Sequence, residues 1–92
     1  MDEDLKDLIE TTVDRRYDEY EGPATVTVAQ LHRRVVERFD RPLSPNEVEV
    51  ACDELVEEGR LVFLRDHGED GRRYCSRNVP QATVDLLREP YV

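Results

Sequence analysis

The fold is decided by the stretch from Ser44 to Arg77, which reads SPNEVEVACDELVEEGRLVFLRDHGEDGRRYCSR. Its first residues have the form of a capping box, with Ser44 at the N-cap, Pro45 at the first helical position and Glu47 at the third. Apolar residues then recur at helical spacing on one face, namely Val48, Ala51, Cys52, Leu55 and Val56. The stretch therefore predicts an amphipathic helix over residues 45–58.

A short hairpin is predicted directly after this helix. Gly59 stands where a helix favours a left-handed residue just past its end. An apolar run at 61–64 is typical of a strand, residues 67–71 are rich in turn formers, and residues 72–77 form a return strand. A helix that leads into a two-stranded hairpin is thus the central unit of the chain.

The flanking segments predict three more helices and one short strand. Helical spacing of apolar residues favours helices over 4–20 and 28–39, and a short helix between Pro80 and Pro90. The β-branched residues at 24–27 favour a strand. The sequence therefore predicts one α+β domain over residues 1–92.

This order of elements resembles the winged helix-turn-helix family over roughly residues 4–78, with residues 79–92 as a tail. The resemblance implies a three-helix core, a short strand and a β-hairpin wing. In that family the second helix of the turn motif enters the major groove, and the wing contacts the backbone or the minor groove. For this chain it implies a small DNA-binding protein that regulates transcription. Winged helices also serve as protein–protein interaction modules, so that alternative stays open.

The composition is strongly acidic. The 92 residues include 22 acidic and 13 basic side chains, which gives a net charge of −9, and Lys6 is the sole lysine. This balance is similar to that of proteins from extreme halophiles, where carboxylates keep a surface hydrated and salt screens their repulsion. The acidic first residues, and the lack of an apolar run near the ~20 residues that span a bilayer, predict a cytoplasmic protein without a membrane partner.

The charges are unevenly distributed along the chain. Residues 45–59 carry six acidic side chains and no basic one, which opposes contact with DNA phosphates. Residues 24–44 and 60–78 each carry a net charge of +2. Under the alternative interpretation, arginines of the second helix only form surface pairs with the acidic helix, as Arg33 or Arg38 with Glu47 or Glu54.

The candidate DNA contacts are arginines of the wing, arginines near the turn, and one asparagine at the start of the acidic helix. They are Arg65, Arg72 and Arg73 on the wing, Arg33, Arg34 and Arg41 near the turn, and Asn46. Side chains of Asn and Gln can read an adenine edge, which adds Gln30, but such residues are also common as caps or solvated polar groups.

The expected partners are double-stranded DNA and a second copy of the chain. The first helix and the tail carry more large apolar side chains than so small a core can cover, which predicts a homodimer through them. These residues are Tyr17, Tyr20, Leu86, Leu87 and Tyr91.

The sequence offers no pattern of catalytic chemistry. Cys52 and Cys75 fall at apolar positions, which predicts reduced core residues. His32 and His67 have no neighbour that forms a nucleophile–base pair, and no CxxC pair or Gly-rich phosphate loop is present. The loop at 66–70 lacks the calcium-loop pattern and reads as a solvated turn. We expect no enzymatic activity, no cofactor and no metal.

Overall fold

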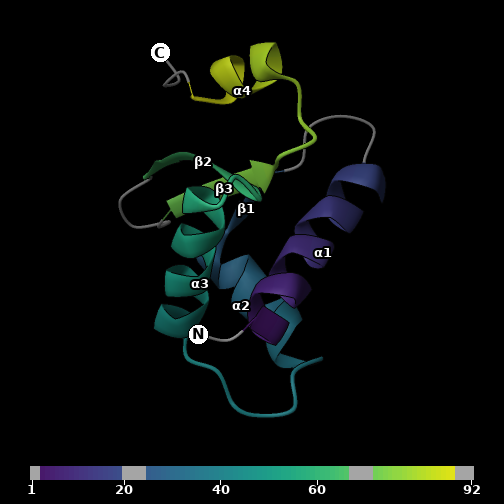
Figure 1. Ribbon diagram of the computed structural model, residues 1–92, viewed down its shortest axis with the longest axis vertical. Coiled ribbons are helices and arrows are strands. Elements are labelled where there is room, and N and C mark those ends of the chain that lie inside the picture. Colours follow the sequence, from purple (N-terminus) through teal and green to yellow (C-terminus); the bar gives the residue numbers. More distant parts are fainter. Residues whose placement is uncertain (1–2, 20–24, 67–71, 89–92) are drawn as a thin grey trace.

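The computed structural model describes residues 3–19, 25–66 and 72–88, and they form a small α+β fold (Figure 1). In chain order the elements are α1 (Glu3–Glu19), β1 (Thr25–Thr27), α2 (Val28–Val36), α3 (Pro45–Glu57), β2 (Leu61–Asp66), β3 (Arg72–Ser76) and α4 (Gln81–Arg88). The predicted order of helices and strands is confirmed. The predicted turn at 67–71 lies outside the described residues.

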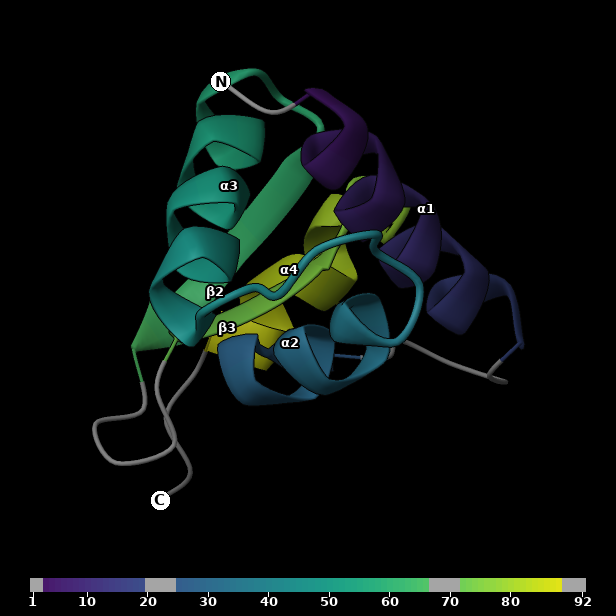
Figure 2. The same cartoon turned by 90° about the horizontal axis from the view of Figure 1, so that it is seen from below.

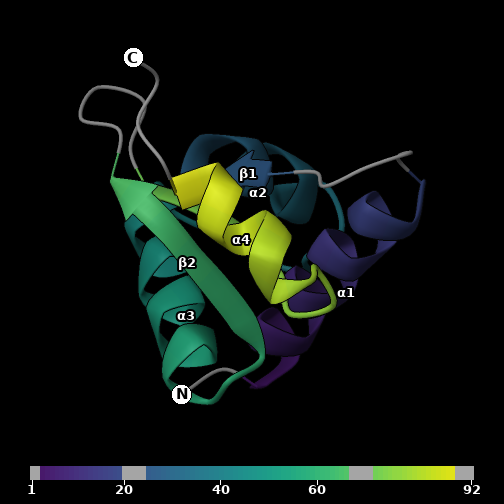
Figure 3. The same cartoon turned by 90° about the horizontal axis from the view of Figure 1, so that it is seen from above.

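The three strands form an antiparallel sheet in the order β1-β3-β2. Tyr74 of β3 is paired with Val26 of β1 on one side and with Phe63 of β2 on the other. A register shift between Phe63 and Arg65 places Arg65 opposite Arg73. Helices α1, α2 and α3 lie on one side of the sheet and α4 lies across the other, as Figures 1 and 3 show.

The core is divided by the sheet into two clusters. The larger cluster joins α1, α2 and α3 to the sheet, and its fully buried side chains include Ile9, Leu31, Leu55 and Tyr74. The smaller cluster joins α4 to the other face, and its buried residues are Leu64, Cys75, Val79 and Val84. Each helix buries one apolar stripe, as its periodicity predicts.

Helices α2 and α3 both begin with a capping box. The Ser44 hydroxyl accepts the Glu47 amide at 3.2 Å, and the Glu47 carboxylate accepts the Ser44 amide at 3.2 Å. Thr27 and Gln30 make the same two contacts at the start of α2. Because the Gln30 side chain is engaged in this cap, its interpretation as a cap is confirmed.

The ends of two helices have clear local causes. Gly59 has a φ of +74°, the left-handed conformation that was predicted after α3. Helix α2 ends at Val36 rather than at residue 39, because the amides of Arg38 and Phe39 both bond to the Val35 carbonyl at 3.0 Å. Two amides that share one carbonyl tighten the last turn and release the chain toward α3.

The structure also places the two cysteines and the apolar residues that we expected at a dimer interface. Cys52 and Cys75 are buried free thiols, one in each core cluster, as predicted. Tyr17 and Leu87, which we expected at a dimer interface, pack against the smaller cluster instead, whereas Leu86 is 68% exposed. Tyr20 and Tyr91 lie outside the described residues.

Among the helices described, none has the length and apolar character that crossing a membrane requires.

Candidate nucleic-acid interface

The outer face of α2 carries exposed arginines that have no partner among the residues the structure describes. Arg33 and Arg34 lie on α2, and Arg38 follows two residues after its end; all three are exposed. Within residues 3–19, 25–66 and 72–88, none of them makes a hydrogen bond or an ion pair. The suggested pairing of Arg33 or Arg38 with carboxylates of α3 is therefore wrong for the described residues.

The turn between α2 and α3 uses its own arginine to hold α3. Arg41 donates to Glu47 at 2.8 Å and lies 5.3 Å from the centroid of the Phe39 ring. The bond from Arg41 lowers the pKa of the Glu47 carboxyl. On the inner side of the turn, the His32 Nε2 lies 2.7 Å from the Leu43 carbonyl oxygen. Arg41 is thus engaged with the fold, although it remains exposed.

Two of the three candidate arginines on the hairpin face away from α3. Arg65 and Arg73 lie opposite each other on β2 and β3, so their side chains emerge on the same face of the sheet. Arg73 donates to the Thr25 hydroxyl at 3.2 Å. This is the face that α4 covers, where Arg88 donates to the Phe63 carbonyl at 2.8 Å. The structure therefore gathers three arginines beside the hairpin, on β2, β3 and α4.

Arg72, the third candidate on the hairpin, is turned toward α3 instead. Its guanidinium lies 3.2 Å from Asp53 and 4.4 Å from the centroid of the Phe63 ring. The Tyr74 hydroxyl donates to the same Asp53 oxygen at 2.8 Å. Burial and this hydrogen bond raise the pKa of Tyr74. Arg72, Asp53 and Tyr74 together fasten the hairpin to α3.

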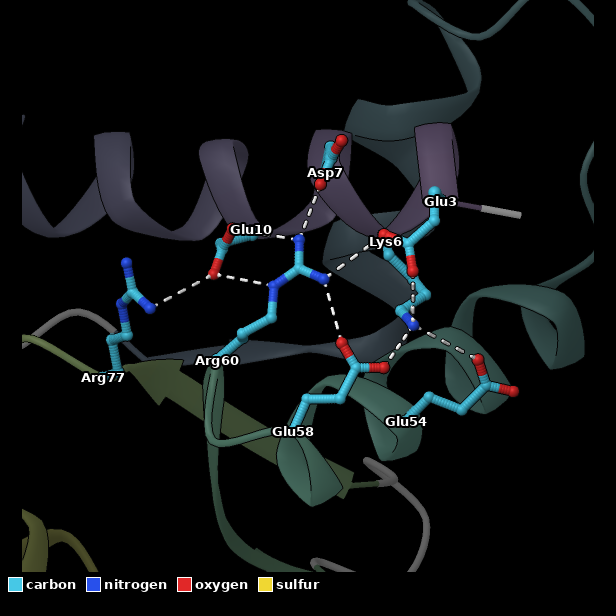
Figure 4. Close-up of polar contacts among 8 residues, drawn as sticks. All are labelled: Glu3, Lys6, Asp7, Glu10, Glu54, Glu58, Arg60 and Arg77. Carbon is cyan, nitrogen blue, oxygen red and sulfur yellow. Dashed lines mark hydrogen bonds and ion pairs between the residues drawn. The ribbon is translucent and has the colours of Figure 1, made fainter. Parts of the chain in front are cut away.

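The opposite flank of α3 is fastened by an ion cluster that also includes α1 and the start of β2 (Figure 4). Arg60 is its centre and lies 2.6–3.4 Å from the carboxylates of Glu3, Asp7, Glu10 and Glu58. These hydrogen bonds, chiefly the one with Glu10, raise the pKa of Arg60. Arg77 adds a more distant contact with Glu10, at 3.8 Å.

Lys6 is the second cation of this cluster. It is only 4% exposed, although it is a lysine, and it contacts Glu3 at 3.1 Å, Glu54 at 3.9 Å and Glu58. The hydrogen bond to Glu58 raises the pKa of Lys6 and lowers the pKa of Glu58. A buried ammonium requires such partners, because burial alone favours its neutral form.

These contacts change how the charge of α3 is to be interpreted. Of the six acidic residues at 45–59, Glu47, Asp53, Glu54 and Glu58 each have a cation of the fold within 4.0 Å. Only Glu49 and Glu57 lack one in the part of the chain that the structure describes. The net charge of −6 counted from the sequence therefore overstates the charge that α3 presents to a partner.

Asn46 lies at the exposed start of α3. Its side chain makes no hydrogen bond to any described residue, and it is free to contact a partner. From the sequence we identified Asn46 and the α2 arginines as candidate contacts, but not the roles of Asp53, Lys6 and Arg60. Each of the three has a partner more than 20 residues away along the chain, a relation that periodicity does not reveal.

The described residues contain no group of three or more His, Cys, Asp or Glu side chains arranged to hold a metal ion. Burial raises the pKa of Cys52 to about 12 and that of Cys75 to about 11, so neither thiol is a nucleophile at neutral pH. His67 and the loop at 66–70 lie largely outside the described residues. The candidate site in the described residues is therefore a charged surface, formed mainly by the exposed arginines of α2.

Comparisons of the chain with models of protein families, with curated proteins and with solved structures gave no match.

Proposed function

We propose that this chain is a small winged-helix protein that binds double-stranded DNA and regulates transcription. In this proposal α2 and α3 form the helix-turn-helix, and β2 and β3 form the wing. Exposed arginines of α2 and half-buried arginines of the hairpin contact phosphates, and α3 with Asn46 faces the groove. The element order and the strand order β1-β3-β2 support it, because a three-helix layer against such a sheet is the arrangement that the resemblance implies.

The observation that carries the proposal is the unpaired state of Arg33, Arg34 and Arg38. The chain has an excess of nine acidic residues, so carboxylates are plentiful as partners. Other arginines of the fold take up to four of them, as Arg60 does. Cations that stay exposed and unpaired among the described residues of so acidic a chain are available to an anionic ligand.

The position of these arginines relative to the hairpin suits a phosphate backbone. Thr27, the N-cap of α2, is paired with Arg73 of β3. At about 1.5 Å per residue, Arg34 lies roughly 10 Å along α2 from that point. This length corresponds to about three base steps of a DNA strand at 3.4 Å each. Arg34 therefore lies within a few base steps of the hairpin backbone, whereas the Arg73 side chain itself emerges on the face of the sheet that α4 covers.

The acidic helix is a smaller obstacle than its sequence indicates. Four of its six acidic residues are compensated inside the fold, by Lys6, Arg41, Arg60 and Arg72. The two that remain, Glu49 and Glu57, are able to accept bonds from cytosine amino groups. Two of the compensating cations, Arg41 and Arg72, were candidate DNA contacts. We propose instead that they hold α3 in position, through Glu47 and Asp53.

The test is a mobility-shift titration of a mixed-sequence duplex over a range of KCl concentrations. We expect the logarithm of the binding constant to fall linearly with the logarithm of salt. The variant Arg33→Ala with Arg34→Ala should reduce that slope by about 2, one for each lost phosphate contact. Arg15→Ala is the matched control, because Arg15 is also exposed and has no partner among the described residues, but lies on α1.

Equal slopes for the α2 double variant and the Arg15 control would remove α2 from the interface. A failure of the intact chain to shift any duplex at about 0.05 M salt, where electrostatic attraction is strongest, would contradict DNA binding as a whole. That result would favour the alternative of a winged-helix interaction module.

A further inference from the structure

A groove of about 220 Å³ lies between α1 and α3, on the flank of α3 opposite the hairpin. Its apolar lining comes from Leu5, Val50 and Ala51. Its polar lining comes from Lys6, Arg41, Asn46, Glu47 and Glu54. Viewed from below, the segment that connects α2 to α3 passes across the space between α3 and α1 (Figure 2), and Arg41 of that segment lines the groove.

Val50 is the unusual residue in this groove. It is one of two large apolar side chains that the described residues leave exposed, at 48%, and the other is Leu86 on α4. Val50 belongs to the outer stripe of α3 with Asn46 and Glu54, at i, i+4 and i+8. An exposed β-branched apolar residue in a helix that is otherwise acidic on its outer face contributes nothing to the core, so its apolar surface is available to a partner.

The size of the groove limits its occupant. A volume of about 220 Å³ is below the ≈ 300–1,000 Å³ typical of pockets that enclose small-molecule ligands. It is sufficient for one or two aliphatic side chains that project from a partner helix. Helices that bind in grooves place such anchors at i, i+3, i+4 and i+7.

The charge around the groove determines the chemistry of that partner. The two helices that form its walls, α1 and α3, carry twelve acidic side chains and three basic ones. After the internal ion pairs are counted, Asp4, Glu49 and Glu57 still have no cation among the described residues. Such a surface repels a second copy that would present the same acidic face. It attracts a basic segment.

We propose that the α1–α3 groove is a docking site for a basic amphipathic helix of a partner protein. Aliphatic side chains of that helix enter the groove over Leu5, Val50 and Ala51. Its lysines or arginines face the unpaired carboxylates of α1 and α3. Docking there needs neither the α2 arginines nor the hairpin, so it can be tested without a duplex, although both partners would use the face of α3 that carries Asn46.

The test uses a fluorescein-labelled helical peptide of Leu, Ala and Lys with its leucines at i, i+3 and i+7. Fluorescence anisotropy at about 0.1 M salt measures its affinity for the full chain, under conditions where surface charges still act over about 10 Å. We expect Val50→Ser to weaken binding about tenfold, which is the effect of losing one buried apolar anchor. Leu86→Ser is the matched control, because it removes the other exposed apolar side chain from α4, and it should leave the affinity unchanged.

Two additional measurements separate docking from adsorption to an acidic surface. A peptide with serine in place of leucine keeps every charge and should bind at least about tenfold more weakly. Amide chemical shifts of the labelled protein should change at Leu5, Val50 and Ala51 on addition of the leucine peptide. Thermal melting of both serine variants should match that of the unchanged chain, because both positions are exposed.

Several outcomes would overturn the proposal. These are no binding of the leucine peptide, equal binding of the serine peptide, equal losses from Val50→Ser and Leu86→Ser, or shift changes confined to α4. Sedimentation that reveals a dimer abolished by Val50→Ser would assign the groove to a second copy and would overturn it as well.

Discussion

The α1–α3 flank and the outer face of α2 use positive charge in opposite ways. On the flank, Arg60 alone contacts four carboxylates, and Lys6 contacts three. On α2 and just after it, three arginines contact none within the described residues. Both regions belong to a chain with a net charge of −9. The number of basic residues in a segment therefore does not measure its capacity to bind an anionic partner; what matters is how many of them remain unpaired.

The strongest test of this contrast reverses the charge of α2. We expect Arg33→Glu with Arg34→Glu to lower duplex affinity by about a hundredfold, since two attractive contacts become repulsive. Binding isotherms at constant salt measure the effect, and Arg15→Glu, compared with Arg33→Glu alone, is the control that makes the same two-unit change in net charge. If the α1 control loses as much affinity as the α2 variant, net charge alone determines binding. The unpaired arginines of α2 would then have no special role.

The next largest effect concerns the hairpin flank of α3. Tyr74→Phe should lower the free energy of unfolding by about 1–2 kcal/mol, because the buried phenol no longer donates to Asp53. Urea unfolding monitored by circular dichroism measures it. Tyr17→Phe is the control, because the Tyr17 hydroxyl makes no bond to a described residue. Equal losses would show that the Asp53 contact does not stabilise the fold.

The two neighbouring acids at the end of α3 give a pH test of the ion cluster. Bonds from Lys6 and Arg60 hold the pKa of Glu58 below its ordinary value of 4.5. Its pairs therefore stabilise the fold above that pH, and the stabilisation is lost as the pH falls through the lowered pKa. We expect Glu58→Gln to flatten the decline of stability between about pH 5 and pH 3. Glu57→Gln, which changes an unpaired acid, should follow the unchanged chain; identical profiles for both variants would contradict the assignment.

The smallest effect is expected at the turn. Arg41 and Glu47 are both exposed, and such pairs contribute little because water screens them. Arg41→Ala should therefore change the melting temperature far less than Arg60→Ala does. Differential scanning calorimetry of the two variants compares an exposed pair with a dense cluster. A larger loss at Arg41 would mean that the turn, rather than the flank, limits stability.

The elements of this fold are predictable from local sequence, and its charge network is not. Ser44, Glu47 and Gly59 act through neighbours a few residues away, so the sequence indicates where α3 begins and ends. Arg60 acts through carboxylates 50–57 residues away, which come near only when α1 packs beside α3. The outward position of Arg33 and Arg34 follows from the burial of Leu31 and Val35, whereas their lack of partners depends on which carboxylates other elements have already taken.

The bond from Arg88 to the Phe63 carbonyl has a consequence for the edge of the sheet. Among the described strands, β2 is paired on one side only, and it begins with four apolar residues in succession. An apolar edge strand can pair with a strand of another molecule, which is a route to aggregation. A guanidinium held against the middle of β2 would have to be displaced first. The short α4 thus helps to keep neighbouring molecules from joining through their sheets.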